Sequence, residues 1–311
     1  MTLGHESDLG DTDPAAMEAN CRAVLDAAWA VGVRYFDAAR SYGRSEEFLA
    51  GWLRARDRQR ADVTVASKWG YTYTAGWKTR AAQHEVKDHS LAALDRQAAE
   101  SLGWLGPWLS VYQIHSVTPD SPVLADAGVL DALRRLRDGG DPGLHGPRDR
   151  GDPGPRRLRL GLTVSGPLQA ELIRRALALR DGDRPLFEVV QATWNLLEPS
   201  AGPALAEAHD AGLTVVLKEG MSNGRLARQP PPALLEVARS LRAAPDAVAL
   251  ASALSQPWAD VVLSGAATVP QIDSNATASL LRIDDGARRA LAGLAEDPQH
   301  YWSARSKLEW T

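Results

Sequence analysis

Four side chains that together could move a proton lie at or just beyond the ends of three predicted strands. They are Asp37 at the end of residues 33–37, Tyr42 on the following loop, Lys68 near the end of residues 63–69 and His115 near the end of residues 109–117. A carboxylate at the end of a buried strand needs a partner, because an unpaired buried charge is costly. This spacing therefore favours a chemical site, although a loop that caps the next helix at Ser45 also accounts for Asp37 and Tyr42 taken alone.

The chemistry of such a set is general acid catalysis at a carbonyl oxygen. A Tyr hydroxyl has an unperturbed pKa near ~10, and a nearby ammonium lowers that pKa. A buried Lys in turn needs a carboxylate, which Asp37 supplies, and a neutral His can orient the carbonyl oxygen. Since side chains do not donate hydride, reduction of the carbonyl carbon requires a cofactor.

The elements that must position these residues alternate between strands and helices. Seven strands are predicted, at residues 33–37, 63–69, 109–117, 158–165, 187–195, 213–218 and 261–264. Helices are predicted at residues 14–31, 45–56, 85–102, 126–137, 168–179, 203–211, 232–243, 247–255, 270–281 and 285–295. This alternation indicates a parallel sheet with right-handed crossovers.

A closed (β/α)8 TIM barrel explains the pattern better than an open dinucleotide-binding sheet. No G-x-G-x-x-G phosphate turn occurs in the chain, which an open sheet of that kind would usually need. The barrel is one strand short, and residues 1–4 resemble the end of a truncated or missing first strand. Residues 139–157 contain ten Gly or Pro residues, and we expect a loop insertion or a corrupted reading frame there.

In a barrel of this kind the active site lies at the carboxyl ends of the strands. Further polar residues end the later strands: Ser165, Gln191, Asn195, Lys218 and Glu219. Each alone has a structural explanation, such as a core histidine at His115, a turn former at Asn195 or a Lys stem lying along apolar surface. Their joint occurrence favours a site.

Composition excludes several classes of function. The net charge is −4 with no basic stripe, which argues against nucleic acid as a partner. No apolar run approaches the ~18 residues of a membrane span, and the polar N-terminus is not a secretory signal. The single cysteine, Cys21, excludes an intrachain disulfide and suits the cytoplasm. Without Cys pairs or His clusters, no metal site is predicted.

The segment FDAARSYGRSEEFLAGWL resembles the "DTAxxYGxSE" segment of the aldo-keto reductase family. Lys68, the YQIHS strand, VVQATWNLLEP and SGAATVPQIDSNATA follow in that family's order over roughly residues 15–295. The resemblance implies a single barrel domain over residues 1–311 with a C-terminal tail at 296–311, carbonyl reduction, a small-molecule carbonyl substrate and NADPH as the usual cofactor, with NADH possible.

The same resemblance assigns roles to individual residues. It implies Tyr42 as general acid, Lys68 and Asp37 as the pair that tunes it, and His115 as the residue that orients the substrate. The residues that it implies for cofactor binding are Ser165, Gln191, Lys218, Gly265, Gln271 and Asn275.

Three departures from the family pattern bear on the cofactor. Gly166 stands where the family often has an Asn for the nicotinamide carboxamide, and Lys218-Glu219 replace an aromatic-Ser pair beside the ring. Residues 264–275 carry no cation for the 2′-phosphate of NADPH. Trp69 and Trp194 follow strands at the same face and are candidates for an aromatic substrate pocket.

Two further functions fit the same residues. A nucleotide-binding regulatory or subunit protein with weak turnover would suit the altered Gly166 and Lys218 positions. A Schiff-base aldolase would use Lys68 or Lys218 as the nucleophile, although the match at residues 271–275 argues against it.

Overall fold

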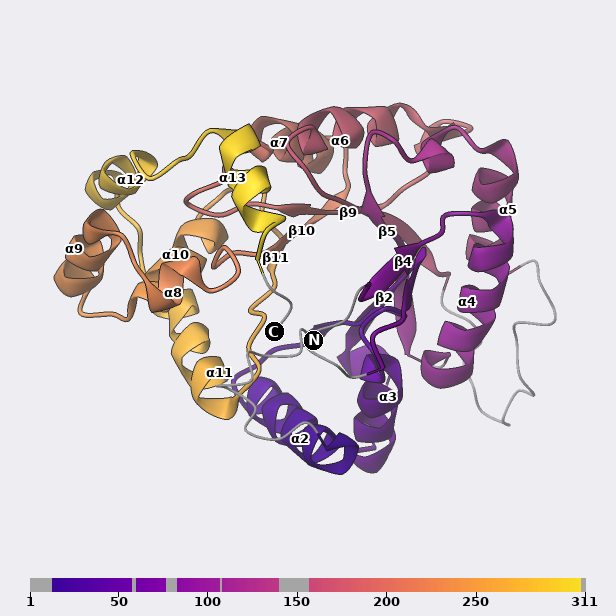
Figure 1. The fold of residues 1–311 in the computed structure, drawn as a ribbon, viewed down its shortest axis with the longest axis horizontal. Helices are drawn as coiled ribbons and strands as arrows, with labels where there is room; N and C mark the ends of the chain where they lie inside the picture. Colours follow the sequence, from indigo (N-terminus) through magenta and orange to yellow (C-terminus); the bar gives the residue numbers. More distant parts are fainter. Residues whose placement is uncertain (1–12, 58–59, 77–82, 107, 140–156, 309–311) are drawn as a thin grey trace.

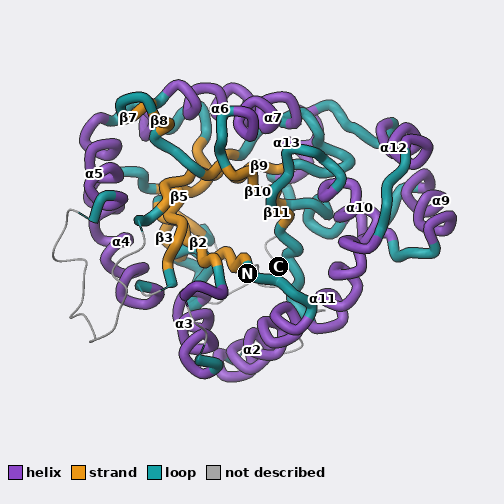
Figure 2. Tube along the Cα trace, turned by 180° about the vertical axis from the view of Figure 1, so that it is seen from behind, coloured by secondary structure: helices purple, strands orange, loops and turns teal. Residues whose placement is uncertain are grey.

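A computed structural model describes residues 13–57, 60–76, 83–106, 108–139 and 157–308. The central sheet consists of seven parallel strands in chain order: β1 (Tyr35–Asp37), β2 (Thr64–Trp69), β5 (Leu109–Val117), β6 (Arg159–Val164), β9 (Val189–Thr193), β10 (Thr214–Lys218) and β11 (Val261–Val262). Figures 1 and 2 show the strands as an inner arc with the helices outside it. This is the barrel architecture that the sequence predicts.

Helices surround the sheet. They are α2 (Pro14–Ala30), α3 (Ser45–Ala55), α4 (Leu91–Leu105), α5 (Ala127–Arg137), α6 (Gln169–Ala178), α7 (Gly202–Asp210), α8 (Arg225–Arg228), α9 (Pro232–Leu241), α10 (Pro245–Leu254), α11 (Val269–Ala276), α12 (Asp285–Ala292) and α13 (Pro298–Arg305). The last of them, α13, lies at the carboxyl end of the strands. Short 3-10 turns occur at Arg60–Asp62, Pro122–Leu124 and Thr277–Leu280. Two small antiparallel pairs lie apart from the main sheet, β3 (Tyr71–Tyr73) with β4 (Glu85–Lys87) and β7 (Arg180–Asp181) with β8 (Arg184–Pro185).

The sheet is open between its first and last strands. In the described part of the chain β1 pairs with β2 alone and β11 with β10 alone. The opening is where an eighth strand preceding α2 would lie, and the proposed remnant at residues 1–4 is outside the described residues. Helix α2 packs on α11 across this side, and Asn20 Nδ2 donates to Ala267 O at 2.8 Å. Helix packing and this hydrogen bond therefore connect the two ends of the sheet.

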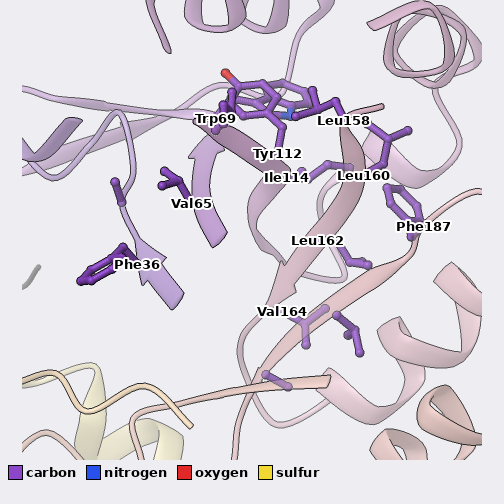
Figure 3. Close-up of a cluster of buried hydrophobic side chains, with 14 of the residues drawn as sticks. Phe36, Val65, Trp69, Tyr112, Ile114, Leu158, Leu160, Leu162, Val164 and Phe187 are labelled. Atoms are coloured by element: carbon purple, nitrogen blue, oxygen red, sulfur yellow. The ribbon is translucent and has the colours of Figure 1, made fainter. Parts of the chain in front are cut away.

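The main hydrophobic core lies between the strands and the surrounding helices. Alternate strand residues point outward into it, among them Phe36, Val65, Tyr112 and Leu160, and Phe187 joins them from just before β9 (Figure 3). The opposite positions fill the inside of the barrel with a small apolar layer of Ala66, Val111, Val189 and Val216. The period of two that runs along each strand thus divides the residues between a core and a barrel interior.

One predicted helix start and one predicted helix cap were wrong. Residues 85–87 form strand β4 rather than the start of a helix, because Ser90 caps the following helix by accepting a hydrogen bond from Ala93 N. Ser45 is the first helical residue rather than the cap, and its hydroxyl donates to Ala39 O at 3.2 Å.

The C-terminal tail contains a helix that is not among those predicted from the sequence. Helix α13 starts after Asp297, whose side chain accepts from His300 N, and has Pro298 in its first turn. An Asp followed by Pro is a usual helix start, so this signal was present in the sequence. Of the predicted 139–157 insertion, residues 140–156 are outside the described residues.

Trp52 joins α2, α3 and the sheet, and its replacement tests the packing of this side of the barrel. Its ring is fully buried 5.3 Å from that of Phe36, and its Nε1 donates to Asp26 Oδ1 at 2.8 Å. We expect Trp52→Ala to lower the free energy of unfolding by about 3–5 kcal/mol, measured by urea denaturation. Trp104→Ala, at a ring that is 38% exposed, is the control and should cost less than about 1 kcal/mol. Equal losses for the two variants would contradict this description of the core.

Candidate active site

The polar residues that the sequence places at strand ends form a layer directly above the apolar interior. Lys68 follows Ala66 by two residues, Gln191 follows Val189, and Lys218 follows Val216. Because side chains on a strand alternate between two faces, these polar groups point into the same interior at the carboxyl end of the barrel. Gln113 above Val111 belongs to the layer as well. The parallel fold therefore gathers residues that are far apart in the chain.

Lys68 and Asp37 form a buried ion pair at the centre of this layer. Lys68 Nζ donates to Asp37 Oδ2 and, at 3.0 Å, to the carbonyl oxygen of Ala38, with 1% of the Lys68 side chain exposed. Burial by itself would lower the pKa of Lys68, but the charge of Asp37 and the contact with Tyr42 outweigh burial and raise that pKa. Lys68 is therefore a cation at neutral pH.

Gln113 supports the pair from the neighbouring strand, and the sequence reading missed it. Its Nε2 donates to Asp37 Oδ1 at 3.3 Å. A glycine opposite makes room for this side chain, since a Cβ on Gly161 would lie 2.8 Å from Gln113 Cγ. The alternation of side chains along β5 could have indicated Gln113, because His115 is on the same face two residues later.

Tyr42 lies over the ion pair on the loop between β1 and α3. Lys68 Nζ is 4.9 Å from the centroid of the Tyr42 ring, and Tyr42 Oη is 3.4 Å from His115 Nε2. Burial raises the pKa of Tyr42, and the Lys68 charge only partly offsets this effect. The predicted net lowering of the phenol pKa is therefore wrong, because desolvation outweighs the ammonium.

His115 is held as a neutral imidazole beside Tyr42. Burial, then the charges of Lys68 and Lys218, place the pKa of His115 well below its ordinary value. Its Nδ1 lies 3.4 Å from Ser41 Oγ. The adjacent Ser116 adopts a φ of 46°, and its backbone N donates to Thr163 Oγ1 at 2.6 Å, which fixes the strand end.

His89 holds the same strand end from outside. Its Nε2 lies 2.8 Å from His115 O and its Nδ1 lies 2.7 Å from Ser121 Oγ. Gly70 is required beside it, because a Cβ there would lie 2.2 Å from His89 Cδ2 and the φ of Gly70 is +105°. His89 and Gly70 therefore support His115 from outside the group formed by Asp37, Tyr42, Lys68 and His115.

Hydroxyl, amide and ammonium groups occupy the other half of the layer. Lys218 Nζ donates to Ser165 Oγ at 2.7 Å, and Ser165 Oγ lies 3.4 Å from Ser116 Oγ. Gln191 is buried, and its Nε2 has no hydrogen-bond partner among the described residues. A buried amide without a partner is costly, so this nitrogen is suited to a ligand acceptor such as a carboxamide oxygen.

The candidate cofactor-binding residues after β11 stabilise the conformation of their own segment. Gln271 Oε1 accepts from Ala267 N at 2.7 Å, Asn275 Nδ2 donates to Ser264 Oγ at 2.8 Å, and Gly265 has a φ of +65°. The segment leads into the N-terminus of α11, where backbone N–H groups favour anions. Gln271 and Asn275 therefore shape the loop through hydrogen bonds within the protein.

Trp69 and Trp194 lie in the hydrophobic core. Trp69 is fully buried beside Tyr112 (Figure 3), on the opposite face of β2 from Lys68. Trp194 is 7% exposed, and its ring centroid is 5.9 Å from that of Trp258. Both rings therefore contribute packing beneath the site, and the described structure gives neither an open pocket face.

Helix α13 adds residues to the same end of the barrel. Arg305 Nε donates to both carboxylate oxygens of Glu219 at 3.1 Å, and the Tyr301 hydroxyl accepts from Asn195 Nδ2 at 3.0 Å. Arg305 also acts electrostatically on Tyr42 and Lys218. Asn195, a candidate from the sequence, thus anchors the tail helix.

Two kinds of feature, a membrane-spanning helix and a cluster of metal-binding side chains, are absent from the described residues. No helix in this part of the chain has both the length and the apolar character needed to cross a membrane. Within the same residues no group of three or more His, Cys, Asp or Glu side chains is placed to hold a metal ion.

Comparison with known proteins gives concordant matches. The model of the Aldo/keto reductase family matches residues 2–141. Aldo-keto reductase str7 of Strobilurus tenacellus is 24% identical over 305 residues, covering 89% of this chain and 81% of the relative.

Solved structures show the same fold. The holo form of aldo-keto reductase AKR11C1 from Bacillus halodurans superposes with a TM-score of 0.69 at 20% identity, covering 96% of this chain and 92% of that one. Its apo form gives a TM-score of 0.63 at 20% identity, with 90% and 88% covered. The family model over residues 2–141, the curated relative and the shared barrel together show that this chain is similar to aldo-keto reductases and has their fold.

Proposed function

We propose that the protein reduces an aldehyde or ketone to an alcohol with a reduced nicotinamide dinucleotide, Tyr42 being the general acid. The observation that carries the proposal is the position of the Tyr42 hydroxyl between His115 Nε2 and the buried Lys68–Asp37 pair. The phenol lies between an ammonium and a neutral imidazole at the carboxyl end of a barrel. Such a phenol is suited to donating a proton to a carbonyl oxygen.

Each residue of the set has a separate task. Tyr42 holds the proton, since burial keeps its hydroxyl protonated at neutral pH. Lys68, kept cationic by Asp37, stabilises negative charge on the phenol oxygen once the proton has left. Neutral His115 presents a nitrogen at the same point and can orient a carbonyl oxygen toward Tyr42.

A bound nicotinamide would supply the hydride, and the residues opposite the proton-transfer set fit its carboxamide. Gln191 has a free buried donor, and Ser165 has a hydroxyl at the same end of the barrel. The segment at Gly265, Gln271 and Asn275, with the α11 N-terminus, is the proposed place for the adenosine and phosphates.

The first prediction concerns the proton donor. Tyr42→Phe should lower kcat for carbonyl reduction by about 10²–10⁴-fold while leaving cofactor binding intact, because only the transferred proton is lost. The measurement is NADPH oxidation with a panel of aldehydes, together with a fluorescence titration of the cofactor.

Tyr112→Phe is the matched control, since it removes a buried hydroxyl that points away from the barrel interior and contacts Ser101. Unchanged turnover in Tyr42→Phe would exclude the proposal. Cofactor binding by the unmodified chain without turnover on any carbonyl would instead favour the nucleotide-binding protein with weak or no catalysis.

A second prediction follows from the pKa directions. The pKa of Tyr42 is raised, so its proton is retained as pH rises, and the pKa of His115 is lowered, so its imidazole stays neutral as pH falls toward 6.5. We therefore expect kcat at saturating cofactor to be nearly constant from about pH 6.5 to about pH 9. A fall in kcat with a midpoint between about pH 7 and pH 8 would mean that the phenol is acidified instead.

The third prediction concerns the choice of coenzyme. Residues 264–275 contain no Lys or Arg to pair with a 2′-phosphate, and Arg225 is bound to Glu296. We propose NADPH as the cofactor with NADH also accepted, and we expect dissociation constants within about tenfold of each other, since one phosphate–cation contact is worth roughly that factor. Isothermal titration with both coenzymes measures the ratio, and a preference for NADPH above a hundredfold would reveal a cation elsewhere in the chain.

A further inference from the structure

Lys218 is the one cation of the described site layer that has no carboxylate of its own. Its Nζ donates to the neutral Ser165 hydroxyl at 2.7 Å. Two carboxylates, Glu219 and Asp37, act electrostatically on Lys218. Both already have partners, because Glu219 is bound by Arg305 and Asp37 by Lys68. The layer therefore carries an uncompensated positive charge on β10.

The chain at the end of β10 keeps these charges separate. Glu219, directly after Lys218, adopts a φ of 56°, which is rare for a residue with a side chain, and its carboxylate meets Arg305 on α13. The backbone oxygen of Glu219 accepts from Asn195 Nδ2 at 2.9 Å, which holds this turn in place. Glu219 is thus unavailable as a direct partner for the Lys218 ammonium.

Lys218 lies among the groups proposed for the nicotinamide carboxamide. Ser165 is its hydrogen-bond partner, and Gln191 occupies the same face of the adjacent strand β9. A ring held through Ser165 and Gln191 therefore lies in the field of this ammonium. An oxidised nicotinamide ring carries a positive charge and a reduced one is neutral, so the ammonium opposes one form and not the other.

We propose that Lys218 makes the site discriminate between the two redox states of the cofactor, binding reduced nicotinamide more tightly than oxidised. This inference rests on the proposed function, and it adds the favoured direction of the reaction. A site that repels the oxidised ring releases it after turnover, which favours carbonyl reduction over alcohol oxidation. Serine, asparagine or an aromatic residue at this position would exert no such charge.

The test compares binding of NADPH and NADP⁺ to the full chain by isothermal titration, without substrate and without turnover. At pH 7 we expect NADPH to bind at least about tenfold more tightly than NADP⁺. Lys218→Met should bring the two dissociation constants within about twofold, chiefly by tightening NADP⁺, whereas Lys218→Arg keeps the charge and should keep the preference. Lys307→Met, at an exposed lysine, is the control and should leave the ratio unchanged.

The pH dependence of the preference for NADPH over NADP⁺ provides a second test. Burial, with Arg305 and Lys68 adding to it and Glu219 and Asp37 opposing it, lowers the pKa of Lys218 to about 8. His115 faces Lys218 as a neutral group, and its own pKa is lowered in part by this ammonium. The preference for NADPH should therefore weaken as pH rises above about 8, because Lys218 then loses its proton, and Lys218→Met should show no such trend.

The outcomes separate this inference from the proposed function. If the wild-type chain binds neither NADPH nor NADP⁺, the proposed function fails. If it binds both equally, or if Lys218→Met keeps the wild-type ratio with an unchanged circular dichroism spectrum, the proposed function stands and the role of Lys218 is refuted. A tighter NADP⁺ complex in Lys218→Met than in the wild type supports the inference directly, since a misfolded variant could not bind more tightly.

Discussion

The site depends on a single buried ion pair, Lys68 with Asp37. An ammonium with 1% of its side chain exposed is tolerable only with a charged partner, and the partner comes from the adjacent strand. This requirement fixes the ends of β1 and β2 relative to each other and places the Tyr42 loop over the pair. Gln113 and the space opposite Gly161 complete the arrangement from β5 and β6. The proposed proton-transfer residues are therefore part of the barrel interior, and their side chains continue the packed layer below them.

The opening in the sheet bears on the cofactor side of the molecule. β1 and β11 are the outer strands among the described residues, and the segment proposed for the adenosine and phosphates starts just after β11. Asn20 of α2 holds Ala267 of that segment, while Gln271 and Asn275 hold it from α11. The same contacts thus connect the two ends of the sheet and shape the loop, so stability of this side and cofactor binding are expected to vary together.

The two halves of the polar layer contain different chemical groups and differ in how their charges are paired. One half contains Tyr42, His115 and the paired Lys68, which suit proton transfer, and the other presents Ser165, Gln191 and Lys218, which suit an amide ligand. Asp37 and Glu219 are each paired with a cation, whereas Lys218 has no carboxylate partner among the described residues. The departure from the family pattern at this position therefore has an electrostatic consequence rather than only a loss of stacking.

The amino-acid pattern by itself determined the order of seven parallel strands and the polar residues at their ends, because both depend on periodicity along the chain. It also indicated a resemblance to the aldo-keto reductase family, through the Asp37–Glu47 stretch and the later strand ends. Only the tertiary structure decided the direction of the Tyr42 pKa, since burial by distant elements outweighs the nearby ammonium. It also showed that Trp69 and Trp194 are buried, and it brought Arg305 of α13 to Glu219. Burial and long-range pairing depend on which elements pack together, and neither can be calculated from the spacing of residues along one chain.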